Sequence, residues 1–297
     1  DLTTGMVSHN GFGWQDNLIN INQVIGTEFN DVICGGTGDD IIYGGDGNDT
    51  ILGSLGSDLL YGGEGTNKLD YSRLTGGVTV DVINGQTTKS QGGQDTFSGF
   101  TQFTGSSGND VFIMPKGNFT INGGAGTDTV DYSQLSLRII VDLRSGRAYQ
   151  ADTASASFGE QYLSSIEKII LPNAVANAGS VVYTSTSGGV SIVGSKGNDT
   201  FYVMGGSNTF SSNGGADWVS YANSGAGVDV RVDANGNGSS IFNGYGGKDI
   251  LYNISYLQGS SYNDYLAGNS ILNGRNGNDT LEGTGTLAIA YYREVST

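Results

Sequence analysis

The residues best suited to chemistry in this sequence are aspartates that recur in short glycine-rich turns. From residue 26 to residue 70, five nine-residue units follow without a gap: GTEFNDVIC, GGTGDDIIY, GGDGNDTIL, GSLGSDLLY and GGEGTNKLD. The middle three place glycine first and fourth, aspartate sixth and an aliphatic residue eighth. Aspartate carboxylates beside glycine carbonyls offer the oxygen ligands that Ca²⁺ prefers, about six to eight per ion. The spacing therefore predicts calcium-binding turns.

The period of nine residues also fixes how these turns stack. A unit reads as a turn followed by a short strand, and two units make one coil, so alternate turns lie on the same edge, about 4.8 Å apart. We expect Asp40 above Asp58 on one edge, and a column of Asp31, Asp49 and Asn67 on the other. Glycine suits the turn because inward-pointing carbonyls need positive φ. The predicted ligands of the array are Asp31, Gly36, Gly38, Asp40, Gly45, Gly47, Asp49, Gly56, Asp58 and Asn67.

The array has little apolar material to hold it together without metal. Its eighth positions should point inward as two facing ladders, formed by Ile33, Ile42, Ile51, Leu60 and Leu69. Such a thin core does not offset repulsion between stacked carboxylates, so folding and metal binding should be one event. We predict about two to three Ca²⁺ ions, the last one weaker because Asn67 brings an uncharged oxygen. The alternative is a metal-free solenoid capped by ordinary Asx turns.

Further turns of similar type follow the array one at a time. Asp110, Asp128, Asp199 and Asp279 are predicted calcium ligands, although each could equally occupy a plain turn because no neighbouring unit is in phase. Asp249 and Asp264 lie in comparable turns. The sequences around Asp128 and Asp279 match the pattern best, and Asp217, in a shortened Gly-Gly-Ala-Asp turn, matches it least.

A longer and looser repeat surrounds these turns. It contains a Tyr-Ser-like step, a Val-x-Val strand, a glycine turn, a second apolar stretch and a Gly-x-x-x-Asn-Asp turn, and it begins near Tyr71, Tyr132 and Tyr221. Nearly every segment is typical of a short strand, including residues 161–171, and the Ala-rich stretches 151–158 and 173–179 are typical of loops. We predict an all-β, right-handed parallel β-solenoid (β-roll), elongated, with Ca²⁺-binding turns. The predicted domains are a β-roll over 1–70 and an irregular continuation over 71–297, with a break near 171–190.

Composition narrows the class of partner. Glycine accounts for 51 of 297 residues, and 29 acidic residues face 13 basic ones, for a formal charge of −16. A chain this acidic repels phosphate backbones, so we expect no nucleic-acid partner. No apolar run approaches the roughly 18 residues of a membrane-spanning helix, so we expect no transmembrane segment. The chain opens on Asp1 without an initiator Met, and we expect it to be part of a longer protein.

An enzyme needs a constellation that this sequence does not offer, so we predict no catalysis. The single histidine, His9, lies in a Ser-His-Asn-Gly turn with no partner motif. The single cysteine, Cys34, occupies the ninth place of a unit, where a buried thiol is expected; it has no cysteine partner for a disulfide or a zinc site. No Gly-x-Ser-x-Gly elbow occurs in a strand–helix context.

The nonapeptide Gly-Gly-x-Gly-x-Asp-x-aliphatic-x resembles the repeats-in-toxin (RTX) motif, a calcium-binding repeat. The looser unit resembles spacer repeats of large surface proteins and adhesins with this motif. The resemblance implies export by bacterial type I secretion and folding on Ca²⁺ outside the cell. We therefore expect a secreted, cell-surface structural module of a surface layer, filament or adhesin, with other copies, other surface proteins or carbohydrate as candidate partners. The alternative is the folding and secretion module of a toxin or hydrolase.

Overall fold

The computed structural model describes residues 1–7, 15–150, 158–173, 179–286 and 288–292. Within these ranges every regular element is a β-strand and none is a helix, which confirms the all-β prediction. No helix of the described residues is therefore long and apolar enough to cross a membrane. His9 and nearly all of the loops expected at 151–158 and 173–179 lie outside the described residues.

The chain forms two compact units. The first comprises Asp1–Val130 together with Gln161–Ile166, and the second comprises Asp131–Glu160 together with Glu167–Thr297. The division predicted between residues 70 and 71, and the break near 171–190, stay predictions.

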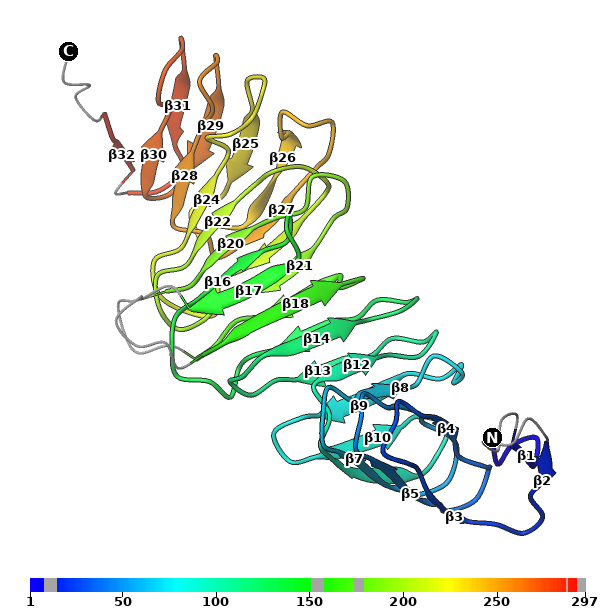
Figure 1. The fold of residues 1–297 in the computed structure, drawn as a ribbon. Helices are drawn as coiled ribbons and strands as arrows, with labels where there is room; N and C mark the ends of the chain where they lie inside the picture. Colours follow the sequence, from blue (N-terminus) through cyan, green and yellow to red (C-terminus); the bar gives the residue numbers. More distant parts are fainter. Residues whose placement is uncertain (8–14, 151–157, 174–178, 287, 293–297) are drawn as a thin grey trace. The chain divides into compact units, whose positions relative to one another are not determined.

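In the first unit the chain winds between two sheets, and successive nine-residue units of the array place their strands on alternate sheets (Figure 1). One sheet contains, in order, β3 (Gln23–Ile25), β5 (Ile41–Gly45), β7 (Leu59–Gly63), β11 (Gln94–Ser98), β10 (Gln86–Lys89), β9 (Val78–Asp81) and β13 (Val111–Ile113). The other contains β4 (Val32–Cys34), β6 (Thr50–Leu52), β8 (Lys68–Asp70), β12 (Gln102–Thr104), β14 (Phe119–Asn122) and β18 (Glu160–Ser164). β15 (Thr129–Asp131) ends the first stretch of the unit, and β1 (Met6–Val7) pairs antiparallel with β2 (Asp16–Asn17).

The aliphatic ladders of the array form as the period predicts. Ile33, Ile51 and Leu69 are in register on β4, β6 and β8, and Ile42 is in register with Leu60 on β5 and β7. All five side chains are buried. They face inward because side chains alternate along a strand, so a strand of three residues buries its central one.

Beyond the array the stacking departs from the purely parallel arrangement that the sequence predicts. β10 pairs antiparallel with both β9 and β11, so the chain inserts a hairpin into the sheet before it resumes parallel pairing of β11 with β7. The turn between β9 and β10 contains Gly85 at φ +65°, a conformation that favours glycine. The longer repeat therefore inserts an antiparallel hairpin, formed here by β9 and β10, into the solenoid. We call a hairpin of this kind a spacer hairpin.

The second unit repeats this plan. One sheet contains β19 (Lys168–Ile170), β21 (Ser191–Val193), β23 (Thr209–Ser211), β27 (Ile250–Tyr252), β26 (Gly238–Phe242), β25 (Asp229–Val232), β29 (Tyr265–Gly268) and β31 (Thr280–Gly283). The other contains β17 (Arg147–Gln150), β16 (Ile139–Asp142), β20 (Val181–Tyr183), β22 (Thr200–Tyr202), β24 (Trp218–Ser220), β28 (Tyr256–Gln258), β30 (Ile271–Asn273) and β32 (Ile289–Ala290). β16 with β17, and β25 with β26, form antiparallel pairs of the same kind as β9 with β10.

Each copy of the longer repeat is marked by a buried tyrosine. Tyr71, Tyr132 and Tyr221 are all fully buried, at 0 % exposure. The stretch 161–171 is strand, as predicted, and divides into β18 and β19 with Ser165 at φ +51° in the turn between them.

Candidate metal centre

The aspartates of the array stack through their own backbones. The N–H of Asp31 donates to Oδ1 of Asp49 at 2.8 Å, and the N–H of Asp49 donates to Oδ1 of Asn67 at 2.8 Å. On the other edge the N–H of Asp40 donates to Oδ1 of Asp58 at 3.0 Å. Each of these bonds spans 18 residues, so the two predicted columns are present with the predicted coil length.

The first glycine of a turn brings carboxylate and carbonyl oxygens to one place. An ideal Cβ on Gly44 would lie 2.4 Å from Oδ2 of Asp49 and 2.4 Å from the carbonyl oxygen of Gly62 in the next coil. Gly105 shows the same arrangement, with Oδ2 of Asp110 and the carbonyl oxygen of Gly123 both 2.3 Å from such a Cβ. A side chain has no room there, and the two oxygens converge from consecutive coils.

Oδ2 of Asp49 is the atom that points most directly to a cation. It is buried and has no hydrogen-bond donor, while Oδ1 of the same carboxylate is bonded to Asp31. Burial raises the pKa of Asp49, which means that its anionic form is disfavoured without a positive charge nearby. An orphaned, buried carboxylate oxygen beside converging carbonyls fits Ca²⁺.

Only part of the predicted glycine set has the expected backbone conformation. Gly45, Gly47 and Gly56 have positive φ, at +111°, +112° and +92°. Gly36 and Gly38 do not, and an ideal Cβ on Gly38 would meet nothing within 4 Å. Gly36 instead donates its N–H to Oδ2 of Asp40 at 2.6 Å, so it supports that carboxylate through nitrogen.

Asn67 is the last residue of its column, and its side-chain amide nitrogen occupies the place that a second carboxylate oxygen would take. Its Nδ2 donates to the carbonyl oxygens of Gly63 at 3.2 Å, Glu64 at 3.4 Å and Gly99 at 3.1 Å. These carbonyls would otherwise be available to a metal, and the amide already satisfies them. The side-chain oxygen that the sequence assigned to Ca²⁺ accepts from Asp49 instead, so Asn67 closes the column.

The turns beyond the array are paired in phase, which the sequence analysis missed. The N–H of Asp110 donates to Oδ1 of Asp128 and that of Asp199 donates to Oδ1 of Asp217, each at 2.8 Å across 18 residues. Asp264 stacks on Asp279 in the same way, at 3.0 Å across 15 residues. The expectation that these turns stand alone is therefore wrong. The signal was in the sequence, because the first two pairs keep the 18-residue spacing of the array.

Asp217, the aspartate whose turn matches the motif least, resembles Asp49 most. It is 0 % exposed, and its Oδ2 is buried without a donor. Burial raises the pKa of Asp217 to about 7. Asp217 therefore joins Asp49 as a candidate ligand.

Three turns beyond the array carry serine in the second place and satisfy their aspartate internally. The hydroxyls of Ser106, Ser195 and Ser260 donate to Oδ1 of Asp110, Asp199 and Asp264, at 2.8, 2.9 and 2.7 Å. The N–H groups of the same serines donate to the Oδ2 atoms, at 2.7, 2.6 and 2.7 Å. Both oxygens of each carboxylate thus have protein donors. Asp110 and Asp199, predicted as calcium ligands, are held as turn caps in this structure.

The candidate metal ligands of these turns are backbone carbonyl oxygens and a few carboxylates. Within the described residues no three His, Cys, Asp or Glu side chains gather as a metal cluster. Sulfur and imidazole, which zinc prefers, do not take part in the columns, whereas oxygen ligands suit a hard cation such as Ca²⁺.

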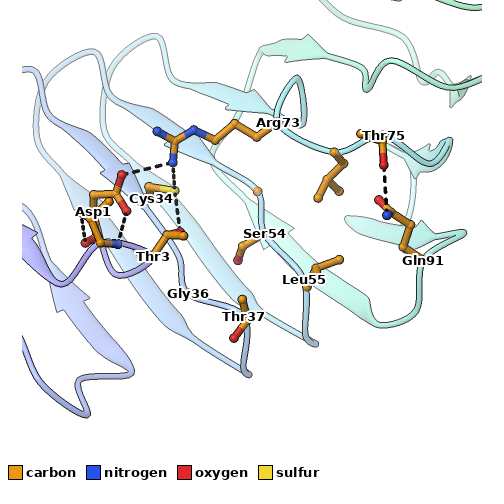
Figure 2. Close-up of a pocket in the computed structure, with 13 residues that line it drawn as sticks. Asp1, Thr3, Cys34, Gly36, Thr37, Ser54, Leu55, Arg73, Thr75 and Gln91 are labelled. Carbon is orange, nitrogen blue, oxygen red and sulfur yellow. Dashed lines mark hydrogen bonds and ion pairs between the residues drawn. The ribbon is translucent and has the colours of Figure 1, made fainter.

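A cavity of about 490 Å³ opens in the first unit beside the turns of Asp40 and Asp58 (Figure 2). Arg73 extends into its wall, where Nη1 donates to Sγ of Cys34 at 2.7 Å and to Oδ2 of Asp1 at 3.2 Å. Cys34 itself is buried, as its ninth place predicts. These contacts fix the thiol in the cavity wall next to the array.

The comparisons with known proteins agree with this geometry. The family model described as RTX calcium-binding nonapeptide repeat (4 copies) matches residues 25–60, 43–73, 117–134, 191–219 and 258–285. The chain therefore carries RTX calcium-binding repeats in a β-roll, and the matched segments include the turn of Asp128 and the Asp199–Asp217 pair.

The chain was also compared with solved structures and with curated proteins. The crystal structure of the extracellular lipase LipA from Serratia marcescens is similar at 18 % identity and a TM-score of 0.23. That match covers 80 % of this chain and 39 % of the lipase, so this chain spans well under half of the lipase's length. No curated protein matches the chain.

Proposed function

We propose that this chain is a calcium-dependent, non-catalytic structural module of a type I-secreted protein, and that it folds on Ca²⁺ outside the cell. RTX repeats are structural calcium-binding modules of exported proteins, and this chain carries them over both compact units. Bound Ca²⁺ would supply the positive charge that stacked, buried carboxylates lack. The residues that would hold it are the sixth-place carboxylates and the carbonyls of the adjacent glycine turns.

One observation supports the proposal above the others. Oδ2 of Asp49 is buried without a donor, in a turn whose first glycine faces both that oxygen and the carbonyl of the next coil. A folded protein leaves few buried polar atoms unpaired, and an absent cation explains this one.

A calcium titration tests the proposal. The full chain, stripped with chelator, should gain β-signal in far-UV circular dichroism as Ca²⁺ rises to millimolar concentration. The same increase in Mg²⁺ should produce much less signal, because Mg²⁺ demands near-ideal octahedral geometry and keeps its water. An unchanged spectrum between chelator and millimolar Ca²⁺ would rule the proposal out.

For the finer role we propose a surface layer, filament or adhesin. The support is the interruption of the array: metal-type turns alternate with spacer hairpins in both units, which suits an extended scaffold better than a compact secretion signal. Fractionation of cells that produce the full-length protein tests this role. Recovery with the cell envelope is expected, whereas recovery only in the culture supernatant would favour the module of a secreted toxin or hydrolase.

A further inference from the structure

Lys89, on the spacer hairpin of the first unit, is a buried cation beside the column that contains Asp40 and Asp58. The residue is 3 % exposed and its side chain is fully buried. Its Nζ donates to the carbonyl oxygen of Ser54 at 2.8 Å, to Oδ1 of Asp95 at 2.5 Å and to Oδ2 of Asp58 at 3.4 Å. Lysine is almost never fully buried unless its charge is paired.

The ammonium contacts Oδ2 of Asp58. The equivalent atom of the preceding turn, Oδ2 of Asp49, has no donor. Asp49 and Asp58 both occupy the sixth place of a nine-residue unit, and Oδ2 of Asp49 is orphaned. Oδ2 of Asp58 has the Lys89 ammonium and the Ser54 hydroxyl, the latter at 3.1 Å. The other ligand of the ammonium, the Ser54 carbonyl, belongs to the second residue of the turn.

The strand that follows the hairpin, β11, continues the column. The N–H of Asp58 donates to Oδ1 of Asp95 at 2.9 Å, the same bond that joins Asp40 to Asp58. Asp95 therefore acts as the next sixth-place carboxylate, and its Oδ2 accepts from the hydroxyl of Tyr71 at 2.8 Å. Lys89 therefore contacts two successive levels of one column, Asp58 and Asp95, and places a positive charge between them.

The β25–β26 hairpin, one of two such hairpins in the second unit, provides an internal comparison. There the N–H of Asn208 donates to Oδ1 of Asp249 at 2.8 Å, so Asn208 and Asp249 stand where Asp58 and Asp95 stand in the first unit. The hairpin residue that closes this level is Asn243, whose Nδ2 donates to the carbonyl of Gly206 at 2.9 Å and to Oδ2 of Asp249 at 3.1 Å.

The charges of the two junctions match. The first has two carboxylates and an ammonium, and the second has one carboxylate and two amides, so each carries one net negative charge. Where the column residue is an aspartate the hairpin brings a lysine, and where it is an asparagine the hairpin brings an asparagine. This correspondence within one chain indicates that the side-chain nitrogen of Lys89 or Asn243 balances the charge of the column residue that it faces.

We propose that the Lys89 ammonium takes the place of a Ca²⁺ ion in the Asp40–Asp58–Asp95 column, and so makes the junction between array and hairpin independent of calcium. The inference rests on the proposed calcium binding of the array. Loss of the ammonium should leave two buried carboxylates and a carbonyl around an empty position, which is a set of ligands that Ca²⁺ can use.

The test is Lys89→Asn in the full chain, with bound calcium counted by native mass spectrometry and unfolding followed in two buffers, one with Ca²⁺ just sufficient to fold the wild type and one with millimolar Ca²⁺. One more Ca²⁺ than in the wild type is expected, with a loss of stability that is larger at the lower Ca²⁺ concentration. Lys68→Asn is the matched control, because Lys68 pairs with Asp70 at 2.7 Å and remains partly exposed. It should leave the calcium count unchanged.

Two results would overturn the inference. One is a folded Lys89→Asn protein with the wild-type calcium count and equal destabilisation in both buffers, as for an ordinary buried ion pair. If Lys89→Asn does not fold in either buffer, the double variant Lys89→Asn/Asp58→Asn decides, because it copies the Asn243 and Asn208 junction. A double variant that folds supports the proposed charge balance, and a double variant that does not fold contradicts it. A wild type that binds no Ca²⁺ would instead contradict the proposed function.

Discussion

The backbone N–H of Asp199 donates to Oδ1 of Asp217, 2.8 Å away and 18 residues later. The same bond joins Asp31 to Asp49 at the other end of the chain. In both pairs the second carboxylate is left with a buried Oδ2 that has no donor. The repeated geometry indicates that metal-type sites occur in the second unit as well as in the tandem array.

Asp49→Asn should weaken the calcium response of the array. The substitution keeps the oxygen that accepts from Asp31 but removes the charge, and calcium affinity depends on the charge of the ligand set. We expect the midpoint of the calcium titration, followed by circular dichroism, to rise roughly tenfold. Asp46→Asn is the control, since Asp46 lies exposed in the same turn. Equal midpoints in the two variants would contradict the assignment of Asp49.

Gly44→Ala should destabilise the protein even when Ca²⁺ is saturating. The new Cβ would lie 2.4 Å from both Oδ2 of Asp49 and the Gly62 carbonyl, so the coils must separate. We expect a loss of roughly 1–3 kcal/mol, typical of overpacking, measured by urea unfolding. Gly38→Ala is the matched control because its Cβ would meet nothing within 4 Å. A Gly38 variant as unstable as the Gly44 variant would refute the steric argument.

The sequence predicts the array well because its signal is local and repeated. Nine-residue periodicity places Ile42 and Leu60 in one ladder and Asp31 and Asp49 in one column, and both arrangements occur. The antiparallel β10 could not be read in the same way, since Gln86–Lys89 is polar and resembles a turn. β10 is a strand because it pairs with β9 and β11, and the local sequence pattern does not show this pairing.

The site residues were predicted unevenly for a related reason. Motif matching ranks a turn by its own letters, so it favoured Asp128 and Asp279 over Asp217. Whether a carboxylate is open or satisfied depends on the second residue of the turn and on the neighbouring segments that pack against it. Ser106 and Lys89 both change that outcome, and neither belongs to the motif.

Ser106→Ala should destabilise the first unit in millimolar Ca²⁺, the condition in which the protein is folded. The hydroxyl of Ser106 donates to Oδ1 of Asp110 and accepts from the N–H of Gly108 at 2.9 Å, so its removal costs two hydrogen bonds in a buried turn. We expect a loss of about 1–2 kcal/mol in urea unfolding. The neighbouring Ser107→Ala serves as control, because its hydroxyl makes only a long contact of 3.4 Å with the Leu74 carbonyl. No difference between the two variants would argue against serine as the internal cap.

Stability of the metal-free protein should fall as pH rises from about 4 to about 7, and Asp217 should account for part of the fall. Burial raises the pKa of Asp217 from 3.8 to about 7, so the folded state holds a proton that the unfolded state has released. Stability decreases with pH wherever the folded state binds more protons, and the effect levels off above the folded pKa. In chelator, the far-UV circular dichroism signal of folded protein should therefore be lost as pH rises through this range, and less steeply for Asp217→Asn, because its amide does not titrate. An unchanged slope would mean that Asp217 is ionised in the folded protein already at low pH.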